Sequence, residues 1–218
     1  MQVDIWSDVV CPWCYIGKRR FESALARFEH RDQVEAVFHS FELDPAAQPR
    51  PAGSNAERLA AKYGISREQA VQQNERLARM AAAEGLKLEF DRVQPGNSFD
   101  AHRLLHLARE QGIQAEVKER LFRAYFTEGE QIGDRETLIR VVAEAGLPRD
   151  QATSVLDGDA YADAVREDER LAADLGINGV PFFVLNGKYG VSGAQPADLL
   201  LSALEQVWKE SAVAEVGS

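Results

Sequence analysis

The sequence predicts an α/β fold in which a βαβ unit and a ββα unit are separated by a large helical insertion. Three observations predict it. A strand, a helix and a second strand fit before residue 42, helical signals then run almost unbroken, and a β-hairpin with an amphipathic helix follows near the C-terminus. With 218 residues, 45% of them hydrophobic and 28% charged, the chain has ample material for a core.

The βαβ unit begins at residues 2–7, where apolar and polar side chains alternate as they do in a strand. From residue 12 to about 29, apolar residues recur at near-helical spacing. Pro12 fits the first turn of this helix, because a missing N–H costs nothing there. Residues 34–41 are rich in Val and Phe and indicate a second strand. The junction between the first strand and the helix therefore falls at Cys11.

The middle of the chain predicts an inserted helical domain. Prolines and a glycine break regular structure at 44–53, and Ser54 with Glu57 and Ser66 with Gln69 form capping-box pairs that open helices. The expected helices are 55–63, 67–84, 99–111, 114–127, 134–145, 148–156 and 159–174. We therefore expect two domains: a discontinuous one, formed by 1–49 and 158–218, and the helical insertion 50–157.

After the insertion the pattern returns to β structure. Phe182–Leu185 and residues 189–191 flank Asn186-Gly187, a strong hairpin signal because Asn and Gly tolerate the positive φ of a tight turn. Residues 195–210 then fit a last amphipathic helix. The complete order, βαβ, helices and ββα, is the layout of a thioredoxin fold with a helical domain set into it.

Both cysteines of the chain lie in one motif, Cys11-Pro12-Trp13-Cys14. A bridge across two residues closes almost no loop and stabilises little, so the pair indicates redox chemistry rather than a structural disulfide. At the start of a helix, unpaired N–H groups and the helix dipole stabilise the Cys11 thiolate. We predict that Cys11 attacks the partner disulfide and that Cys14, one turn further in, resolves the mixed disulfide.

Zinc binding is the competing interpretation of this motif. A structural zinc site needs about four ligands, and the sequence has no second pair of cysteines. His102 and His106 could complete a Cys2His2 set from the insertion, but the ligand spacing of known zinc sites is missing. We expect the two histidines on a helix surface or at the domain interface, and we predict no metal site.

A second motif, Val180-Pro181, directly precedes the predicted strand Phe182–Leu185. X-Pro bonds are usually trans, so the local sequence alone favours an ordinary proline that opens a strand. The position of Pro181 after a βαβ unit and a helical stretch, and just before a hairpin, reverses that preference. In the thioredoxin fold a cis-proline at this point faces the CxxC motif, and the residue before it offers its backbone to an extended substrate.

Taken together, these segments resemble the DsbA-like family, and its FrnE-type branch in particular. The resemblance rests on the strand followed by Cys-Pro-Trp-Cys-Tyr-Ile-Gly, on Ser-Phe-Glu-Leu-Asp-Pro at 40–45, on Asn97 with Ala-His-Arg at 101–103, and on Gly-Val-Pro-Phe-Phe at 179–183. It covers essentially the whole chain. It implies dithiol–disulfide oxidoreductase or isomerase activity, with Cys11 as nucleophile, Cys14 as resolving thiol and Pro181 as the cis-proline.

Two positions depart from the family pattern. Pro12-Trp13 stands between the cysteines where periplasmic DsbA-type enzymes have Pro-His. Because that histidine helps to stabilise the thiolate, we hypothesise a weaker oxidant, with a potential below about −120 mV. Ile5 stands where DsbA-type folds carry a buried acid. Asp8 is the nearest candidate for a proton acceptor, and a turn or cap residue is at least as good an interpretation of it.

Substrate contacts are expected from Pro12, Trp13 and Val180 around the cysteines. His102 joins them because the resemblance places it in a segment that lines the active-site side of the insertion. The expected partners are protein or small-molecule disulfides, together with a thiol reductant that recycles the enzyme. The redox-active disulfide needs no bound cofactor, although glutathione could serve as a co-substrate.

Two other functions stay open. Kappa-class glutathione transferases and hydroxychromene carboxylate isomerases share this architecture, but they use glutathione with a serine at the catalytic position, so the two cysteines argue against them. A chaperone could bind clients through the apolar surface around Trp13, but it would need no paired thiols.

Charge and hydropathy bear on location and partners. The formal net charge of −10, with Lys and Arg scattered, argues against nucleic-acid binding. The sequence has no apolar run of about 18 residues, so we expect no membrane span. The N-terminus lacks the features of a leader, which makes a cytoplasmic location the expectation.

Overall fold

The computed structural model describes residues 1–49 and 52–216. The elements are β1 (Gln2–Ser7), α1 (Pro12–Arg27), the 3-10 turn η1 (Arg31–Gln33), β2 (Glu35–Ser40), α2 (Asn55–Tyr63), α3 (Arg67–Ala83), α4 (Phe99–Glu110), α5 (Gln114–Arg123), the π-helical turn η2 (Ala124–Glu128), α6 (Arg135–Glu144), α7 (Arg149–Asp157), α8 (Ala162–Asp174), β3 (Phe182–Leu185), β4 (Tyr189–Ser192) and α9 (Ala197–Val216). This order confirms the predicted α/β fold with its helical insertion.

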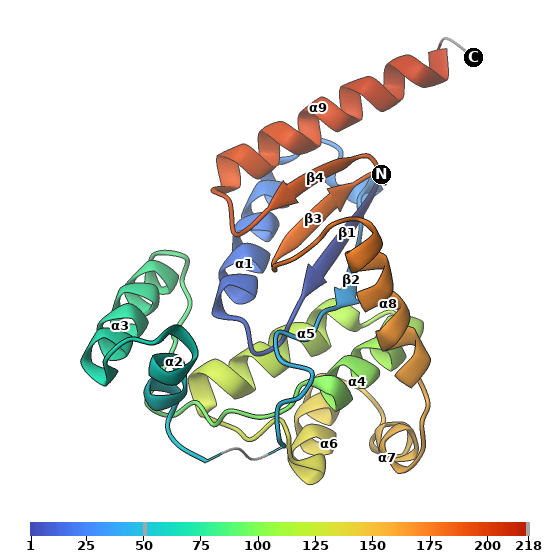
Figure 1. The fold of residues 1–218 in the computed structure, drawn as a ribbon. Coiled ribbons are helices and arrows are strands. Elements are labelled where there is room, and N and C mark those ends of the chain that lie inside the picture. Colours follow the sequence, from blue (N-terminus) through green and yellow to red (C-terminus); the bar gives the residue numbers. More distant parts are fainter. Residues whose placement is uncertain (50–51, 217–218) are drawn as a thin grey trace.

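The four strands form one mixed sheet in the order β2-β1-β3-β4. β1 pairs in parallel with β2 and antiparallel with β3, and β3 pairs antiparallel with β4 in the predicted hairpin. Figure 1 shows that β1 runs through the sheet toward the helices of the insertion, so the loop after β1 lies between sheet and insertion.

Helices cover both faces of the sheet. On one face Ile5 of β1 packs in a cluster with Phe21 of α1 and Leu204 of α9. On the other face Trp6 packs against Ala172 of α8. Neighbouring residues of a strand point to opposite faces, which is why Ile5 and Trp6 enter different clusters. The loop between α8 and β3 therefore starts on the face of the sheet that carries Trp6, and it brings residues 179–181 to the start of β3.

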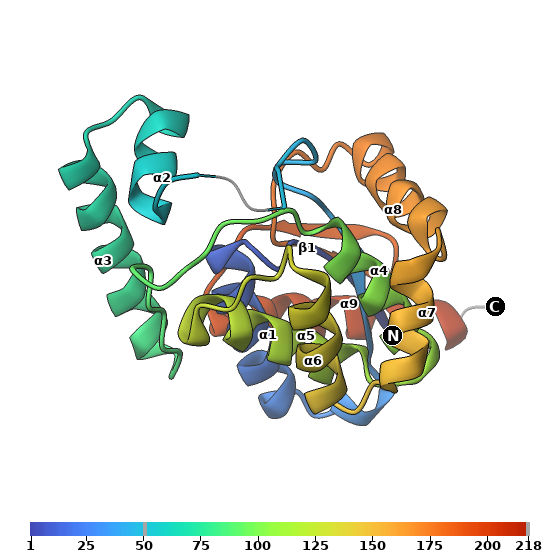
Figure 2. The same ribbon diagram turned by 90° about the horizontal axis from the view of Figure 1, so that it is seen from below.

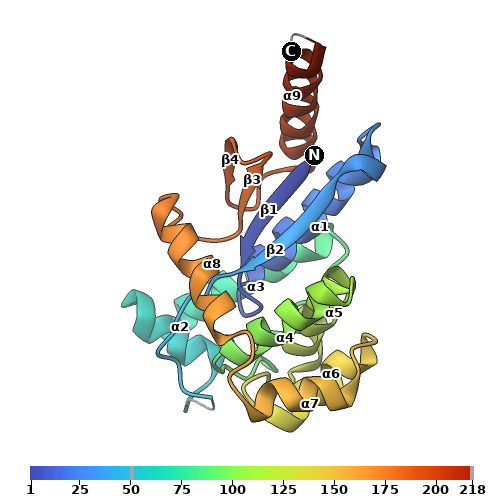
Figure 3. The ribbon, with the colours of Figure 1, turned by 90° about the vertical axis from the view of Figure 1, so that its right-hand side faces the viewer.

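Helices α4 to α7 form a layer at the carboxyl end of β1 (Figure 3). Their largest cluster of buried side chains includes Leu104, Leu121 and Phe122, and it is continuous with Cys14 and Ile16 of α1. Helices α2 and α3 pack on each other and stand to one side of this layer (Figure 2). The motif that carries the cysteines is thus part of the interface between the two regions of the chain, whose boundaries at 49/50 and 157/158 stay a prediction.

Local signals explain several of the helix ends. Both predicted capping boxes are present, at Ser54 and at Ser66. Helix α8 starts at Ala162 rather than near 159, because Tyr161 adopts a left-handed backbone conformation with φ of 63° and interrupts the helix there. The helix expected over 114–127 changes to a π-helical turn after Arg123, a local irregularity that the hydrophobic period does not reveal.

Candidate active site

Cys11 occupies the position that the sequence predicts, at the N-terminus of α1. It is the N-cap residue, with extended backbone angles, and Pro12 follows in the first turn. The backbone N–H groups of Cys14 and Tyr15 donate to the Cys11 carbonyl oxygen, at 3.0 and 3.3 Å. The Cys11 side chain makes no capping hydrogen bond. Its sulfur therefore lies at the positive end of the helix without serving as a structural cap.

Cys14 lies one turn further in and is 1% exposed. Both cysteines are free thiols in this structure. Burial and the neighbouring Cys11 raise the pKa of the Cys14 thiol well above its ordinary value, while the backbone at Asp8 and the charge of Lys118 act in the opposite direction. Cys14 is therefore held as a neutral thiol that needs a nearby positive charge or base before it can attack a disulfide.

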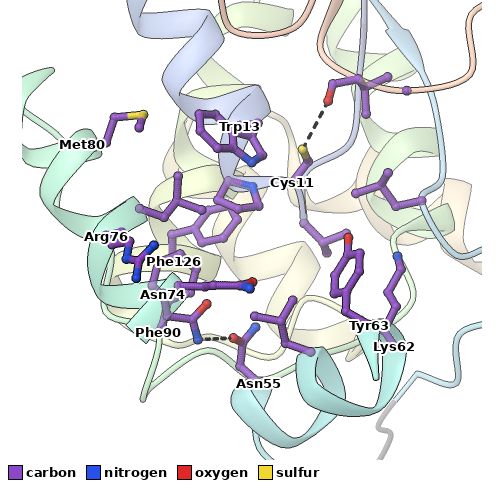
Figure 4. A pocket seen from close by; sticks show the side chains of 18 residues that line it. Cys11, Trp13, Asn55, Lys62, Tyr63, Asn74, Arg76, Met80, Phe90 and Phe126 are labelled. Atoms are coloured by element: carbon purple, nitrogen blue, oxygen red, sulfur yellow. Dashed lines mark hydrogen bonds between the residues drawn. The ribbon is translucent and has the colours of Figure 1, made fainter. Parts of the chain in front are cut away.

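The Val180–Pro181 peptide bond is cis, as the resemblance implies. The Cys11 Sγ donates a hydrogen bond to the carbonyl oxygen of Val180, with 3.7 Å between the atoms (Figure 4). The carbonyl of Pro181 accepts from the N–H of Gly193, at 2.8 Å. The loop before β3 is thus held against the sulfur, although the two segments are 169 residues apart in sequence.

A pocket of about 560 Å³ opens beside Cys11 (Figure 4). One wall comes from the thioredoxin-like region and includes Pro12, Trp13 and Val180, so three of the four predicted substrate contacts line it. The indole of Trp13 is 42% exposed at this wall. The facing wall comes from the helical region and is largely apolar, with polar groups at its rim: Asn55, Leu59, Lys62, Tyr63, Gln73, Asn74, Arg76, Leu77, Met80, Phe90 and Phe126.

The fourth predicted contact, His102, is not among the residues that line the pocket. It is 1% exposed, and its Nε2 lies 3.4 Å from Oδ1 of Asp8. Since His102 belongs to α4 and Asp8 follows β1, the expectation of a domain-interface position is confirmed, and that of a surface position is wrong for this residue. Contact between His102 and substrate stays a prediction, and this placement does not support it.

Asp8 is fully buried and accepts hydrogen bonds from the backbone N–H groups of Val10, at 3.3 Å, and Leu43, at 2.8 Å. Burial alone would raise the pKa of the Asp8 carboxyl, but His102, the backbone N–H of Leu43 and the Ser98 side chain outweigh it and hold the pKa below its ordinary value. A carboxylate with a lowered pKa is a weak base. The placement therefore favours the interpretation of Asp8 as a turn residue over that of a proton acceptor.

The structure does not assemble the alternative Cys2His2 set. His106 Nε2 lies 3.1 Å from both Ser40 Oγ and Asp168 Oδ2, whereas His102 faces Asp8. Among the residues that the structure describes, no group of three or more His, Cys, Asp or Glu side chains could hold a metal ion.

Lys118 on α5 is a functional candidate that the sequence reasoning missed. Its side chain is 0% exposed, and its Nζ donates to the carbonyl oxygen of Ser7 at 3.3 Å. Burial lowers the pKa of the Lys118 ammonium to about 8, an effect that Cys14, Asp8 and Cys11 oppose. Helical period was the available signal, because residues 118, 122 and 125 share one face of a helix and the latter two are aromatic.

A family model for the DSBA-like thioredoxin domain matches residues 2–205. The chain belongs to this family. Its match to a solved structure of a probable DsbA oxidoreductase, SCO1869 from Streptomyces coelicolor, has 49% sequence identity and a TM-score of 0.92, and it covers 96% of this chain and 91% of that one. Membership and fold therefore agree with the resemblance that the motifs indicated; the FrnE-type branch is consistent with these matches.

Two more distant structures share the fold of this DSBA-like chain. The cytosolic disulfide reductase DsbM from Pseudomonas aeruginosa with GSH is 18% identical, with a TM-score of 0.66, and the match covers 96% of this chain and 100% of that one. A 2-hydroxychromene-2-carboxylate isomerase is 21% identical, with a TM-score of 0.69 and coverage of 98% and 99%. In the described part of the chain, no helix combines the length and the apolar character that crossing a membrane requires.

Proposed function

We propose that this protein is a thiol–disulfide oxidoreductase that exchanges disulfides with protein or small-molecule substrates through the Cys11–Cys14 pair. One observation carries the proposal. The Cys11 sulfur lies at the N-terminus of α1, 3.7 Å from the Val180 carbonyl oxygen; both thiols are buried, but Cys11 lines the pocket and Cys14 does not. This arrangement supports different roles for the two thiols.

The reaction follows from the different roles of Cys11 and Cys14. The Cys11 thiolate attacks one sulfur of a substrate disulfide, so that a mixed disulfide forms and the first substrate thiolate leaves. The Cys14 thiolate then attacks Cys11 Sγ, the bond between Cys11 and the substrate breaks, and the second substrate thiolate leaves. The substrate gains two electrons and the enzyme is oxidised to the Cys11–Cys14 disulfide. A thiol reductant restores the dithiol, and the same steps run backward when the enzyme acts as an oxidant.

The pocket supports substrates that combine an apolar stretch with negative charge. Trp13, Leu77 and Met80 offer apolar surface, and the rim carries the cations Lys62 and Arg76 in a chain with a net charge of −10. Val180 lies beside Cys11 and can pair its backbone with an extended chain. Glutathione, a peptide thiol with two carboxylates, fits these features as a co-substrate. The distant structural neighbour DsbM holds GSH.

The decisive experiment compares Cys11→Ser with Cys14→Ser in reduction of a protein disulfide and in refolding of a scrambled-disulfide substrate. We expect Cys11→Ser to abolish both activities, whereas Cys14→Ser accumulates a mixed disulfide that mass spectrometry detects. Rescue of the scrambled substrate by the reduced enzyme alone indicates an isomerase; a requirement for the oxidised enzyme indicates an oxidase. Full turnover by Cys11→Ser would rule the proposal out.

A glutathione-dependent isomerase or transferase is the second candidate, favoured by the shared fold with 2-hydroxychromene-2-carboxylate isomerase. This candidate predicts the opposite result for Cys11→Ser. Because these glutathione-dependent enzymes use a serine at the catalytic position, a glutathione-dependent isomerisation should survive the substitution. The cytoplasmic location stays a prediction of the sequence, and fractionation of cells that produce the protein tests it.

A further inference from the structure

Lys118 is a buried amine whose polar surroundings only partly replace water. Among the described residues its Nζ donates one hydrogen bond, to Ser7, and otherwise lies over the rings of Phe122 and Phe38, with 5.3 and 5.8 Å to their centroids. An ammonium has three donors, and its transfer from water to such a site is costly unless an anion compensates. The position therefore needs a partner that carries negative charge during part of the protein's cycle.

The charges that act most strongly on Lys118 belong to Asp8 after β1, and to Cys11, Cys14 and Lys18 on or at the start of α1. Asp8 is already engaged with His102 and two backbone N–H groups. Lys18 forms ion pairs with Glu22 and Glu119, at 2.5 and 2.6 Å. The two thiols remain, and the stronger electrostatic interaction of Lys118 is with Cys14.

Helix α5 holds Lys118 in place against α1. The neighbouring Glu119 accepts from Tyr15, Lys18 and Arg19 of α1, at 2.8, 2.6 and 2.7 Å. Tyr15 also stacks on Phe122 of α5, with 4.7 Å between ring centroids. Because Tyr15 follows Cys14 directly, these contacts fix the face of α5 that carries Lys118 beside the turn of α1 that carries Cys14.

We propose that Lys118 is the charge partner and proton acceptor of Cys14, supplied to the redox centre by the helical insertion. The inference rests on the proposed function. When the mixed disulfide at Cys11 resolves, the proton of the Cys14 thiol passes to the neutral Lys118 amine. The resulting thiolate attacks Cys11 Sγ, and the substrate leaves as a thiolate that takes a proton from water. The ammonium then releases its proton, which restores the neutral amine.

The proton affinities of the two groups suit this exchange. Burial raises the pKa of the Cys14 thiol and lowers the pKa of the Lys118 ammonium to about 8, so an appreciable fraction of Lys118 is the neutral amine near neutral pH, whereas an ordinary lysine is almost entirely protonated there. Formation of the thiolate creates the anion that makes a buried ammonium favourable. Asp8, whose pKa is lowered, is less suited to take up the proton.

The direct test measures ionisation of Cys14 in a Cys11→Ser background, where Cys14 is the only thiol and its thiolate absorbance can be titrated. We expect Lys118→Met to raise the midpoint of the Cys14 titration by at least about one pH unit. At a pH below both midpoints, the variant then holds about tenfold less Cys14 thiolate than the Cys11→Ser parent. Lys18→Met removes a nearby cation that has carboxylate partners of its own, and this control should shift the midpoint by less than about a third of a unit.

Two kinetic readouts in the two-cysteine protein separate the steps. Lys118→Met should lower the rate at which a preformed mixed disulfide is resolved at least about tenfold, and it should alter the pH profile of that rate. The rate of alkylation of Cys11 should change less than about threefold. Met retains the length of the side chain and places no charge in the buried site, so it avoids the cost of dehydrating an ammonium and we expect a folded variant. Lys118→Gln, which can still donate to the Ser7 carbonyl, is measured in parallel should Lys118→Met not fold.

The outcomes are distinguishable from those that test the proposed function. An unchanged Cys14 titration and unchanged resolution in a folded Lys118 variant would overturn the inference, even where Cys11→Ser abolishes exchange and the proposed function stands. If the wild-type protein performs no disulfide exchange, the proposed function fails, yet the Cys14 titration still decides whether Lys118 stabilises its thiolate.

Discussion

Gly17 of α1 lies directly against Pro181: a Cβ atom on Gly17 would approach the proline Cγ to 2.7 Å. The contact joins the helix that begins at Cys11 to the loop that presents the Val180 carbonyl. Gly17 falls within the Cys-Pro-Trp-Cys-Tyr-Ile-Gly segment, and this approach is a physical reason for a residue without a side chain at that position.

Substitution Gly17→Ala should therefore separate α1 from Pro181. We expect a loss of about 1–3 kcal/mol in the free energy of unfolding, because neither the proline ring nor the helix can move freely in a packed interior. Exchange activity should fall as well, since the Cys11 sulfur moves relative to Val180. Denaturant unfolding and the activity assay provide the measurement. Gly158→Ala, where the nearest atom is 4.0 Å away and φ is negative, is the matched control.

The residue between Pro12 and Cys14 should set the redox potential. Trp13 is 42% exposed on the pocket wall, so another side chain can be accommodated without a change in the core. We expect equilibration with glutathione buffers to place the wild-type potential below about −120 mV, and Trp13→His to raise it because a histidine there stabilises the thiolate. A wild-type potential at or above that value would contradict the hypothesis of a weaker oxidant.

His39 should make stability fall as pH rises. Its ring bridges Asp168, at 2.7 Å, and Asp4, at 2.8 Å, and although burial alone would lower the pKa of His39, the two carboxylates outweigh it and raise the pKa. A raised pKa in the folded state means that the stabilisation is fully present below the unfolded pKa of about 6.5 and is lost as pH passes through the folded value.

Thermal unfolding from about pH 6 to 9 measures this effect. We expect His39→Gln to flatten the decline in that window, whereas His30→Gln should leave it in place, because the His30 ring stacks on Trp208, with 4.3 Å between centroids, outside the His39 cluster. An equal decline in wild type and His39→Gln would show that other groups cause it.

Asp8→Asn distinguishes the turn role of Asp8 from a role in proton transfer. The buried carboxylate accepts two backbone N–H groups, so we expect a loss of about 1–3 kcal/mol in unfolding free energy at neutral pH. Because the folded pKa of Asp8 is lowered, its stabilisation is present above the unfolded pKa and disappears as pH falls through the folded value. The pH profile of mixed-disulfide resolution should keep its shape, and loss of that profile in Asp8→Asn would assign the proton step to Asp8.

Much of the site could be predicted because its signals are local. Pro12 in a helical first turn predicted the N-terminal position of Cys11, and the hairpin signal after Pro181 placed the loop that faces it. Lys118, which the sequence did not single out, shows the limit of this reasoning. The period of a helix indicates which residues share a face, but not which neighbouring segment that face meets.

The sequence by itself determined the order of the elements, the position of both cysteines in the motif and the residues of the hairpin, because hydrophobic period, capping and turn chemistry act between near neighbours. Only the tertiary structure decided that Lys118, Asp8 and His102 are buried around the redox pair. Burial depends on the packing of α5 and α4 against the end of β1 and the residue after it, which are 111 and 94 residues away in sequence. The cost of dehydrating a charge, and with it the proton affinity of each group, arises only once that packing has removed water.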